Sequence, residues 1–250
     1  MKKIRRVTEP DAIAEFLKNE FYRDEFHHDR DHFEQLVMHA DIANASENAL
    51  RRALLFRRRG HMWRELPADT QWWEVCIEPA DLKLLRVFPR AQWRRIASGD
   101  FLLESIVERI RQQKFSGRTR SFISKVQALS YQLRSGDDAR TCVLLIGVDE
   151  TSPFTILEGN HRLTAALLAN EELIERRFRV LCGFSPRMPE SCWYQTNLAS
   201  LWRYAKNRMR NLLYDKDADI ERALRECGNE LAPDVLERAL PNRKAVQGSK

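Results

Sequence analysis

The stretch Phe154–Ala166, FTILEGNHRLTAA, decides which fold we expect. Four residues typical of a strand precede the turn Glu158–Arg162, and an Ala- and Leu-rich helix follows at once. The first turn of a helix has backbone N–H groups without intrahelical partners, and the helix dipole favours an anion there. The turn also carries a carboxylate, an amide, an imidazole and a guanidinium. We therefore expect an anion site at this turn; the alternative is that its polar residues cap the helix and face water.

The segments around this turn predict further strands. Apolar, β-branched runs indicate strands at 71–78, 141–148 and 177–184. The loop 149–153 then joins two of the strands as a hairpin would. Strand, strand, loop, strand, turn, helix and strand follow one another along the chain.

The turn resembles that of the ParB/sulfiredoxin superfamily, in which a strand ends in a short turn that opens a helix and binds nucleotide phosphates. It is most similar to the Asp-Gly-His-His-Arg turn of the ParB-like free-serine kinases. Gly159 and the His-Arg pair match this pattern, while Glu158 replaces the Asp and Asn160 replaces the first His. The resemblance covers residues 72–185. It implies an α/β (α+β) fold with a small mixed-sheet core and helical extensions on both sides.

This resemblance implies a nucleotide, ATP or another, as cofactor, together with Mg²⁺. The activity expected is phosphoryl transfer to a hydroxyl group of a small molecule, as in a kinase-like transferase. The backbone N–H groups of Gly159, Asn160 and His161 would cradle the phosphates. The Arg162 guanidinium would neutralise their charge.

Three carboxylate or imidazole groups are candidates for the chemical step. Glu158 is placed to orient the acceptor hydroxyl, to accept its proton or to hold Mg²⁺. His161 is placed to hydrogen-bond a phosphate or to protonate a leaving oxygen. The free-serine kinases use a separate upstream Glu as the proposed base, and we assign that role to Glu78. Further candidates for it are Glu74, Asp149 and Glu150.

Length and composition limit the classes of protein. The chain has 250 residues, of which 31% are charged and 43% hydrophobic, which is typical of a globular protein. No apolar run reaches the roughly 18 residues needed to span a bilayer, and the N-terminal residues do not resemble a signal peptide. We therefore expect a cytoplasmic protein with a small-molecule substrate and no membrane partner.

Two other functions remain as alternatives. The first is a metal-dependent, biosynthetic small-molecule enzyme that uses the same pocket, with Glu158 and His161 as ligands. The second is a ParB-like, DNA-associated nucleotide-binding protein, since the net charge is +6 and Arg203–Arg210 mixes basic and aromatic residues. Nucleic acid is the less favoured partner because no helix-turn-helix pattern is clear.

Histidine, cysteine and tryptophan residues give weaker signals. His28 and His32 have the i, i+4 spacing of a two-histidine metal site, or belong to a polar exposed turn near His27. The five cysteines include no C-x-x-C pair and suggest buried small side chains; Cys192 is a weak redox candidate. Trp193 and Tyr194 would stack on a planar ring or anchor the core.

The remaining segments predict a division of the chain into four parts. We expect a helical N-terminal extension at 1–70, the core at 71–186, a helical C-terminal extension at 187–240 and a disordered tail at 241–250. Within the C-terminal extension, the pattern predicts an amphipathic helix over 198–213. Its inward side would consist of Leu201, Trp202, Ala205, Met209 and Leu212. Shorter helices are expected at 219–227 and 233–240.

Overall fold

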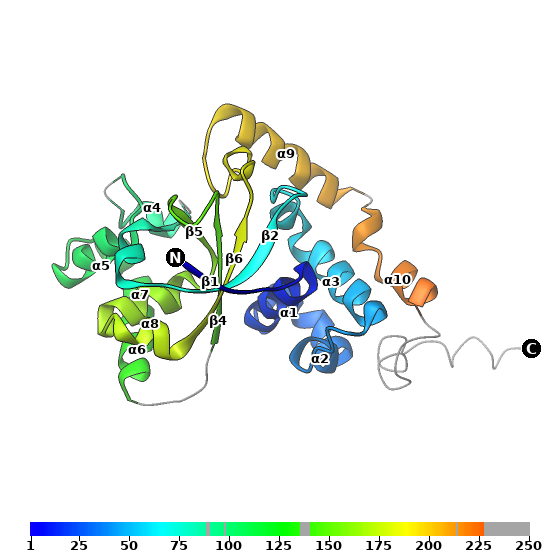
Figure 1. Ribbon diagram of the computed structural model, residues 1–250, viewed down its shortest axis with the longest axis horizontal. Coiled ribbons are helices and arrows are strands. Elements are labelled where there is room, and N and C mark those ends of the chain that lie inside the picture. Colours follow the sequence, from blue (N-terminus) through cyan, green and yellow to red (C-terminus); the bar gives the residue numbers. More distant parts are fainter. Residues whose placement is uncertain (89–90, 98, 136–140, 214, 228–250) are drawn as a thin grey trace, which may run out of the picture. The chain divides into compact units, whose positions relative to one another are not determined.

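The computed structural model describes residues 1–88, 91–97, 99–135, 141–213 and 215–227 (Figure 1). The chain forms two compact units. One consists of Met1–Thr8 and Leu66–Leu201, and the other of Glu9–Glu65 and the described residues from Trp202 onward. The first unit holds the sheet and the second is helical.

The sheet has six strands in the order β1-β2-β6-β4-β5-β3. These are β1 (Lys2–Arg6), β2 (Gln71–Cys76), β3 (Leu85–Val87), β4 (Thr141–Gly147), β5 (Phe154–Glu158) and β6 (Phe178–Phe184). Strand β4 runs parallel to β6, and β3 runs parallel to β5, while the other pairs are antiparallel. The mixed sheet with its helices confirms the α/β (α+β) fold class, and β2, β4, β5 and β6 lie where strands were predicted.

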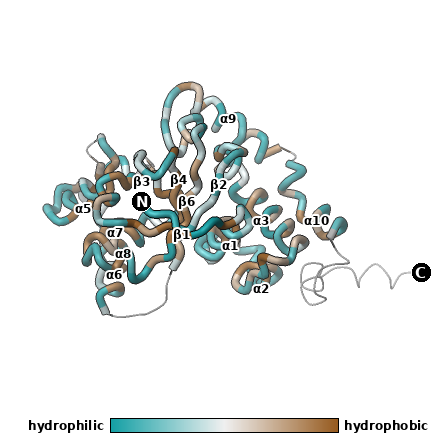
Figure 2. Tube along the Cα trace, in the orientation of Figure 1, coloured by the Kyte–Doolittle hydropathy of each residue, from teal (hydrophilic) through white to brown (hydrophobic). Residues whose placement is uncertain are grey.

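Strand β4 lies inside the sheet and contributes much of the core. Val143 and Leu145 on β4 are fully buried. They belong to one hydrophobic cluster with Leu163 and Ala166 of the helix that follows the turn Glu158–Arg162. Four helices contribute buried residues to the same cluster (Figure 1). They are α5 (Leu103–Arg111), α6 (Arg120–Arg134), α7 (Asn160–Ala169) and α8 (Glu172–Arg177). The hydrophobic colour in Figure 2 follows β4 and β6, as continuous apolar runs predict for strands covered on both faces.

Two arginines from neighbouring helices cap the C-terminal end of α7 with hydrogen bonds. The guanidinium of Arg111 donates to the Leu167 carbonyl at 3.0 Å, and that of Arg134 donates to the carbonyls of Leu168 and Ala169. These carbonyls lack intrahelical donors, and a cation also suits the negative end of the helix dipole. The helix that begins at the motif turn is thus held at its other end.

Short helices complete this unit. They are η2 (Pro79–Leu84), α4 (Ala91–Arg94), η3 (Gly117–Thr119) and η4 (Met188–Glu190). Strands β1 and β3 were not predicted. Lys2–Arg6, which the sequence pattern placed in a helical extension, pairs with β2 at the edge of the sheet instead.

The helical unit is built around α3 (Ala45–Trp63). Its other elements are α1 (Glu9–Glu20), η1 (Asp24–Asp29), α2 (Arg30–Met38), most of α9 (Leu198–Leu212), η5 (Lys216–Ala218) and α10 (Ile220–Cys227). The guanidinium of Arg51 on α3 is fully buried and contacts the Glu47 carboxylate at 2.9 Å and the Leu36 carbonyl at 3.0 Å. It also donates to the Asn48 side chain and the Asp41 carbonyl.

The predicted helix over 198–213 is present as α9, but its inward side was predicted wrongly. Leu201, Trp202, Ala205, Met209 and Leu212 are all exposed. Periodicity identifies an apolar face, and it does not say which face contacts the body of the protein. The helix predicted at 233–240 and the tail at 241–250 lie outside the described residues. Among those that are described, no helix is both long and apolar enough to cross a membrane.

Candidate functional site

Gly159 makes the turn between β5 and α7. Its φ of 101° and ψ of 16° lie in the left-handed region, and it is the residue that precedes the first turn of α7. A Cβ placed on Gly159 would lie 2.9 Å from Val143 Cγ2, closer than real contacts allow. Two constraints therefore require glycine here: the left-handed conformation and the close approach of the turn to β4.

A break in the strand pairing lies just before this turn. Leu145 pairs with Ile156, so a regular ladder would set Leu157 opposite Leu144, but Glu158 occupies that position. One extra residue in β5 changes the face to which the following side chain is directed. Opposite residues share a face, so Glu158 lies on the face of Leu144 rather than that of Ile156.

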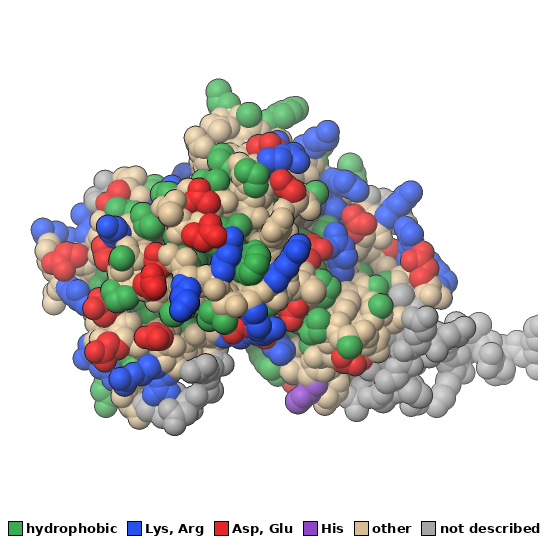
Figure 3. Space-filling view, in the orientation of Figure 1, with side chains coloured by type: hydrophobic (Ala, Val, Ile, Leu, Met, Phe, Trp, Pro, Cys, Tyr) green, Lys and Arg blue, Asp and Glu red, His purple; other side chains and the backbone are tan. Residues whose placement is uncertain are grey.

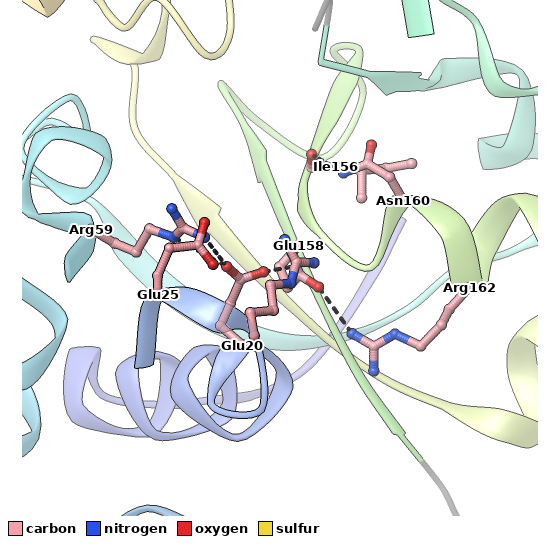
Figure 4. A network of polar contacts seen from close by, with 8 residues as sticks. Glu20, Glu25, Arg59, Ile156, Glu158, Asn160 and Arg162 are labelled. Carbon is pink, nitrogen blue, oxygen red and sulfur yellow. Dashed lines mark hydrogen bonds and ion pairs between the residues drawn. The ribbon is translucent and has the colours of Figure 1, made fainter. Parts of the chain in front are cut away.

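Glu158 and Arg162 form an ion pair across the turn. The Arg162 guanidinium donates to Glu158 Oε1 at 3.4 Å, and the two side chains are partly exposed (Figure 4). They stand four residues apart, which brings them to the same side of the chain as α7 begins. The pair holds the guanidinium beside the first turn of α7 and leaves part of both charges open to solvent.

Gly159, the residue before α7, has no side chain to cap the N–H groups of the helix's first turn, and its carbonyl accepts from Leu163. Asn160 donates through Nδ2 to the Ile156 carbonyl at 3.3 Å (Figure 4). Its Oδ1 is buried and has no hydrogen-bond partner among the described residues. A buried acceptor without a donor is costly, so the Asn160 Oδ1 would gain from a hydrogen-bond donor brought to the turn.

His161 is packed among aromatic side chains. Its ring centroid lies 5.4 Å from that of Trp93 on α4 and 4.9 Å from that of Phe122 on α6. Both partners are buried and belong to the core cluster. The ring has a structural contact with the core that the sequence pattern did not indicate.

The structure does not bring Glu78 to the turn. Glu78 follows β2, and β6 and β4 lie between β2 and β5 in the sheet. Glu74 and Glu158 occupy the same row across these strands, so three strand spacings, about 14 Å, separate their backbones. Glu78 lies further along the chain, and its N–H donates to Asp81 Oδ2. Glu74 is engaged by Arg5 at 2.7 Å and by Arg179 at 3.2 Å.

The other two candidate bases are stabilised as anions. Asp149 accepts hydrogen bonds from the N–H and hydroxyl of Thr151 and the N–H of Ser152, which lower its pKa to about 2. Glu150 pairs with Lys3, and this hydrogen bond is the main cause of its lowered pKa. A carboxylate with a low pKa is a weak base near neutral pH. Glu158 is thus the one predicted carboxylate that the described structure places at the turn itself.

Arg86 on β3 is a candidate that sequence reasoning missed. It pairs in register with Thr155 of β5, and its guanidinium lies 3.5 Å from Thr155 Oγ1, 3.4 Å from the Tyr194 carbonyl and 4.8 Å from the Tyr194 ring centroid. Its Nε is buried without a partner, and no carboxylate among the described residues pairs with it. Burial lowers the pKa of this guanidinium. The one signal in the sequence was a charged residue between two apolar ones, Leu85 and Val87.

The remaining candidates have structural contacts. Trp193 is buried and packs against Phe88 in a tilted arrangement, with ring centroids 4.3 Å apart. His28 lies in η1 and His32 in α2, so the two do not share one regular helix. Within the described part of the chain, no group of three or more His, Cys, Asp and Glu residues is placed to hold a metal ion. Cys192 is buried, and burial also raises the pKa of the Cys182 thiol well above its usual value.

Comparison with known proteins adds no assignment. No family model, no curated protein and no solved structure matches the chain.

Proposed function

We propose that the turn Glu158–Arg162 binds the phosphates of a nucleotide, and that the protein transfers a phosphoryl group to the hydroxyl of a small molecule. The observation that carries the proposal is the α7 N-terminus. There a left-handed Gly159 brings the N–H groups of the first helical turn together with the Arg162 guanidinium. Backbone donors and a guanidinium are the groups that neutralise phosphate.

The remaining groups of the turn suit the acceptor. The orphaned Oδ1 of Asn160 needs a donor, and a phosphate has none to offer at neutral pH, whereas a substrate hydroxyl does. Glu158 then takes the hydroxyl proton as the new oxygen–phosphorus bond forms and the bond to the nucleoside diphosphate breaks. Carboxylate and phosphate oxygens are also what Mg²⁺ prefers, and Glu158 would be the residue to hold it.

Arg86 supports an anionic ligand through a separate observation. It is a half-buried cation with no carboxylate partner among the described residues, on the strand next to β5. A buried charge without a counter-charge is unfavourable. A bound anion would remove that penalty.

The test is isothermal titration of the full chain with ATP, ADP and CTP, with and without Mg²⁺. Arg162→Ala should weaken nucleotide binding by about tenfold or more, since it removes a charge-assisted hydrogen bond. The matched control is Arg176→Ala, an exposed arginine of the same unit, which should bind like the parent protein. Thermal unfolding of both variants shows whether the fold is kept.

Metal analysis of the isolated protein accompanies the titration. Nucleotide binding that Arg162→Ala abolishes in a folded protein supports the proposal. An unmodified protein that binds none of the three nucleotides contradicts it. A stoichiometric metal in that case would favour the metal-dependent enzyme.

A further inference from the structure

Helix α9 presents its apolar side chains to solvent. Trp202 is 76% exposed, Met209 64%, Leu212 76% and Leu213 72%. With Ala205 they recur at intervals of three and four residues, so they form one stripe along the helix. Single exposed apolar residues are common, but a continuous stripe of large ones marks an interaction surface. Figure 3 shows green side chains projecting where Figure 1 draws α9.

The opposite side of the helix is polar and faces the helical unit. Tyr204 packs against His61 of α3 with ring centroids 5.9 Å apart, and Asn207 Nδ2 donates to Glu65 Oε1 at 2.7 Å. Asn211 lies against Gly60 of α3. All these partners belong to the same compact unit. The helix is therefore attached through its polar residues, the reverse of an ordinary surface helix.

Basic side chains flank the apolar stripe. Arg203, Lys206, Arg208 and Arg210 are all exposed. The sequence from 191 to 214 contains no Asp or Glu. The nearest acid after the helix, Asp215, is buried and pairs with Arg64. Arg210 lies 4.0 Å from the Asp217 carboxylate. The surface is therefore apolar along its centre and cationic at its borders.

We propose that this surface of α9 binds an anionic lipid bilayer, with the apolar stripe in the boundary between headgroups and acyl chains. An interfacial helix has this composition: cations on the polar flanks and Trp and Leu on the apolar face. The helix would lie along the bilayer surface, so the lack of a spanning helix among the described residues does not bear on the proposal. The sequence-based expectation of no membrane partner rested on spanning length and on an N-terminus unlike a signal peptide, and neither concerns a helix that lies on a bilayer surface.

Charge and shape favour lipid over other occupants. A second copy of this face would bring four cations against four, which is repulsive. Nucleic acid would use the cations but would leave Met209, Leu212 and Leu213 without apolar contacts. A groove of a partner protein that encloses a helix would displace the contacts of Tyr204 and Asn207. A flat anionic surface satisfies the exposed side and leaves those contacts in place.

The test is co-sedimentation of the full chain with vesicles of phosphatidylcholine alone and of phosphatidylcholine mixed with phosphatidylglycerol. We expect binding to the anionic vesicles that weakens as salt rises. The triple variant Trp202→Ser, Met209→Ser and Leu212→Ser should weaken binding by about tenfold or more. The quadruple variant of Arg203, Lys206, Arg208 and Arg210 to Gln should weaken it at least as much.

Matched controls come from the other unit. Tyr131→Ser removes a side chain that is 75% exposed, as Trp202 is, from helix α6. Replacing the exposed Arg118, Arg120, Lys125 and Arg176 by Gln removes the same charge. Both controls should bind the anionic vesicles like the parent protein.

Three outcomes would overturn the proposal. In the first, the parent protein fails to bind anionic vesicles. In the second, the apolar triple variant binds as well as the parent, which would mean that charge attraction alone causes the binding. In the third, sedimentation without lipid shows a dimer that the triple variant loses, and the face is then a contact between copies.

Discussion

The Arg162 guanidinium lies 3.4 Å from the Glu158 carboxylate. The residue proposed to bind phosphate and the residue proposed as the base therefore neutralise one another's charge in the free protein. Binding a phosphate at the α7 N-terminus would draw the guanidinium to the ligand and release the carboxylate. The carboxylate would thus become available as a proton acceptor only once the nucleotide is bound. Because of the ion pair, substituting one of the two residues also changes how available the other is to a ligand.

Glu158→Gln should separate binding from transfer. The amide keeps the shape but not the charge, so Arg162 loses its ionic partner and becomes more available to phosphate. We expect nucleotide affinity to stay the same or to rise by a few-fold, while phosphoryl transfer falls by about a hundredfold or more. Titration and a transfer assay measure the two effects. Equal loss of both would mean that Glu158 only supports the turn.

Gly159→Ala should destabilise the first unit through both conformation and contact. Alanine is strained at a φ of 101°, and its Cβ would lie 2.9 Å from Val143. Each effect costs about 1–3 kcal/mol, so the free energy of unfolding should fall by at least 2 kcal/mol or so. Chemical denaturation measures it.

Two other glycines serve as controls for this change. Gly99 has a φ of 110°, but a Cβ added there would meet nothing within 4 Å, and Gly117 has neither constraint. Gly99→Ala should show the conformational cost alone, and Gly117→Ala should be nearly neutral. If Gly159→Ala is no worse than Gly99→Ala, the contact with β4 is unimportant.

The sheet shows which parts of the fold could be predicted from sequence. Strands β2, β4, β5 and β6 carry apolar and β-branched runs because they form the buried part of the sheet. Strand β1, with the sequence KKIRR, is mostly exposed and forms by backbone pairing with β2 and the Arg5–Glu74 ion pair. Strand β3 has three residues, too few for any period. Edge pairing and short strands depend on partners distant in the chain.

The candidate site divides in the same way. Residues 158–162 could be proposed from sequence because a local motif, a turn followed by a helix, carries the pattern. Arg86 and the aromatic contacts of His161 were missed, since strand order and helix packing create them. The outward face of α9 was missed because a helical period is the same for a buried and an exposed stripe.

Arg51→Met should destabilise the helical unit strongly. The substitution keeps much of the volume but leaves the Glu47 carboxylate and two backbone carbonyls without the donor that they share. Removing one partner of a buried ion pair costs about 3–5 kcal/mol. The neighbouring Arg52, an exposed arginine paired with Glu9, provides the control. Arg52→Met should change the denaturation midpoint little, because exposed ion pairs contribute about 0–1 kcal/mol.

Asp149→Asn should lower stability near neutral pH and have a smaller effect in acid. The pKa of Asp149 falls from its ordinary 3.8 to about 2 in the folded chain, because the Thr151 and Ser152 donors prefer the carboxylate. A lowered folded pKa stabilises the protein above the unfolded value, and this contribution is lost as pH falls from about 4 through about 2. Denaturation of parent and variant across this range should therefore give curves that converge in acid. Thr151→Val, which removes the hydroxyl donor at 2.8 Å, should raise the carboxyl pKa as followed by NMR titration. Curves that stay parallel down to the lowest pH would show that these hydrogen bonds do not favour the charged form.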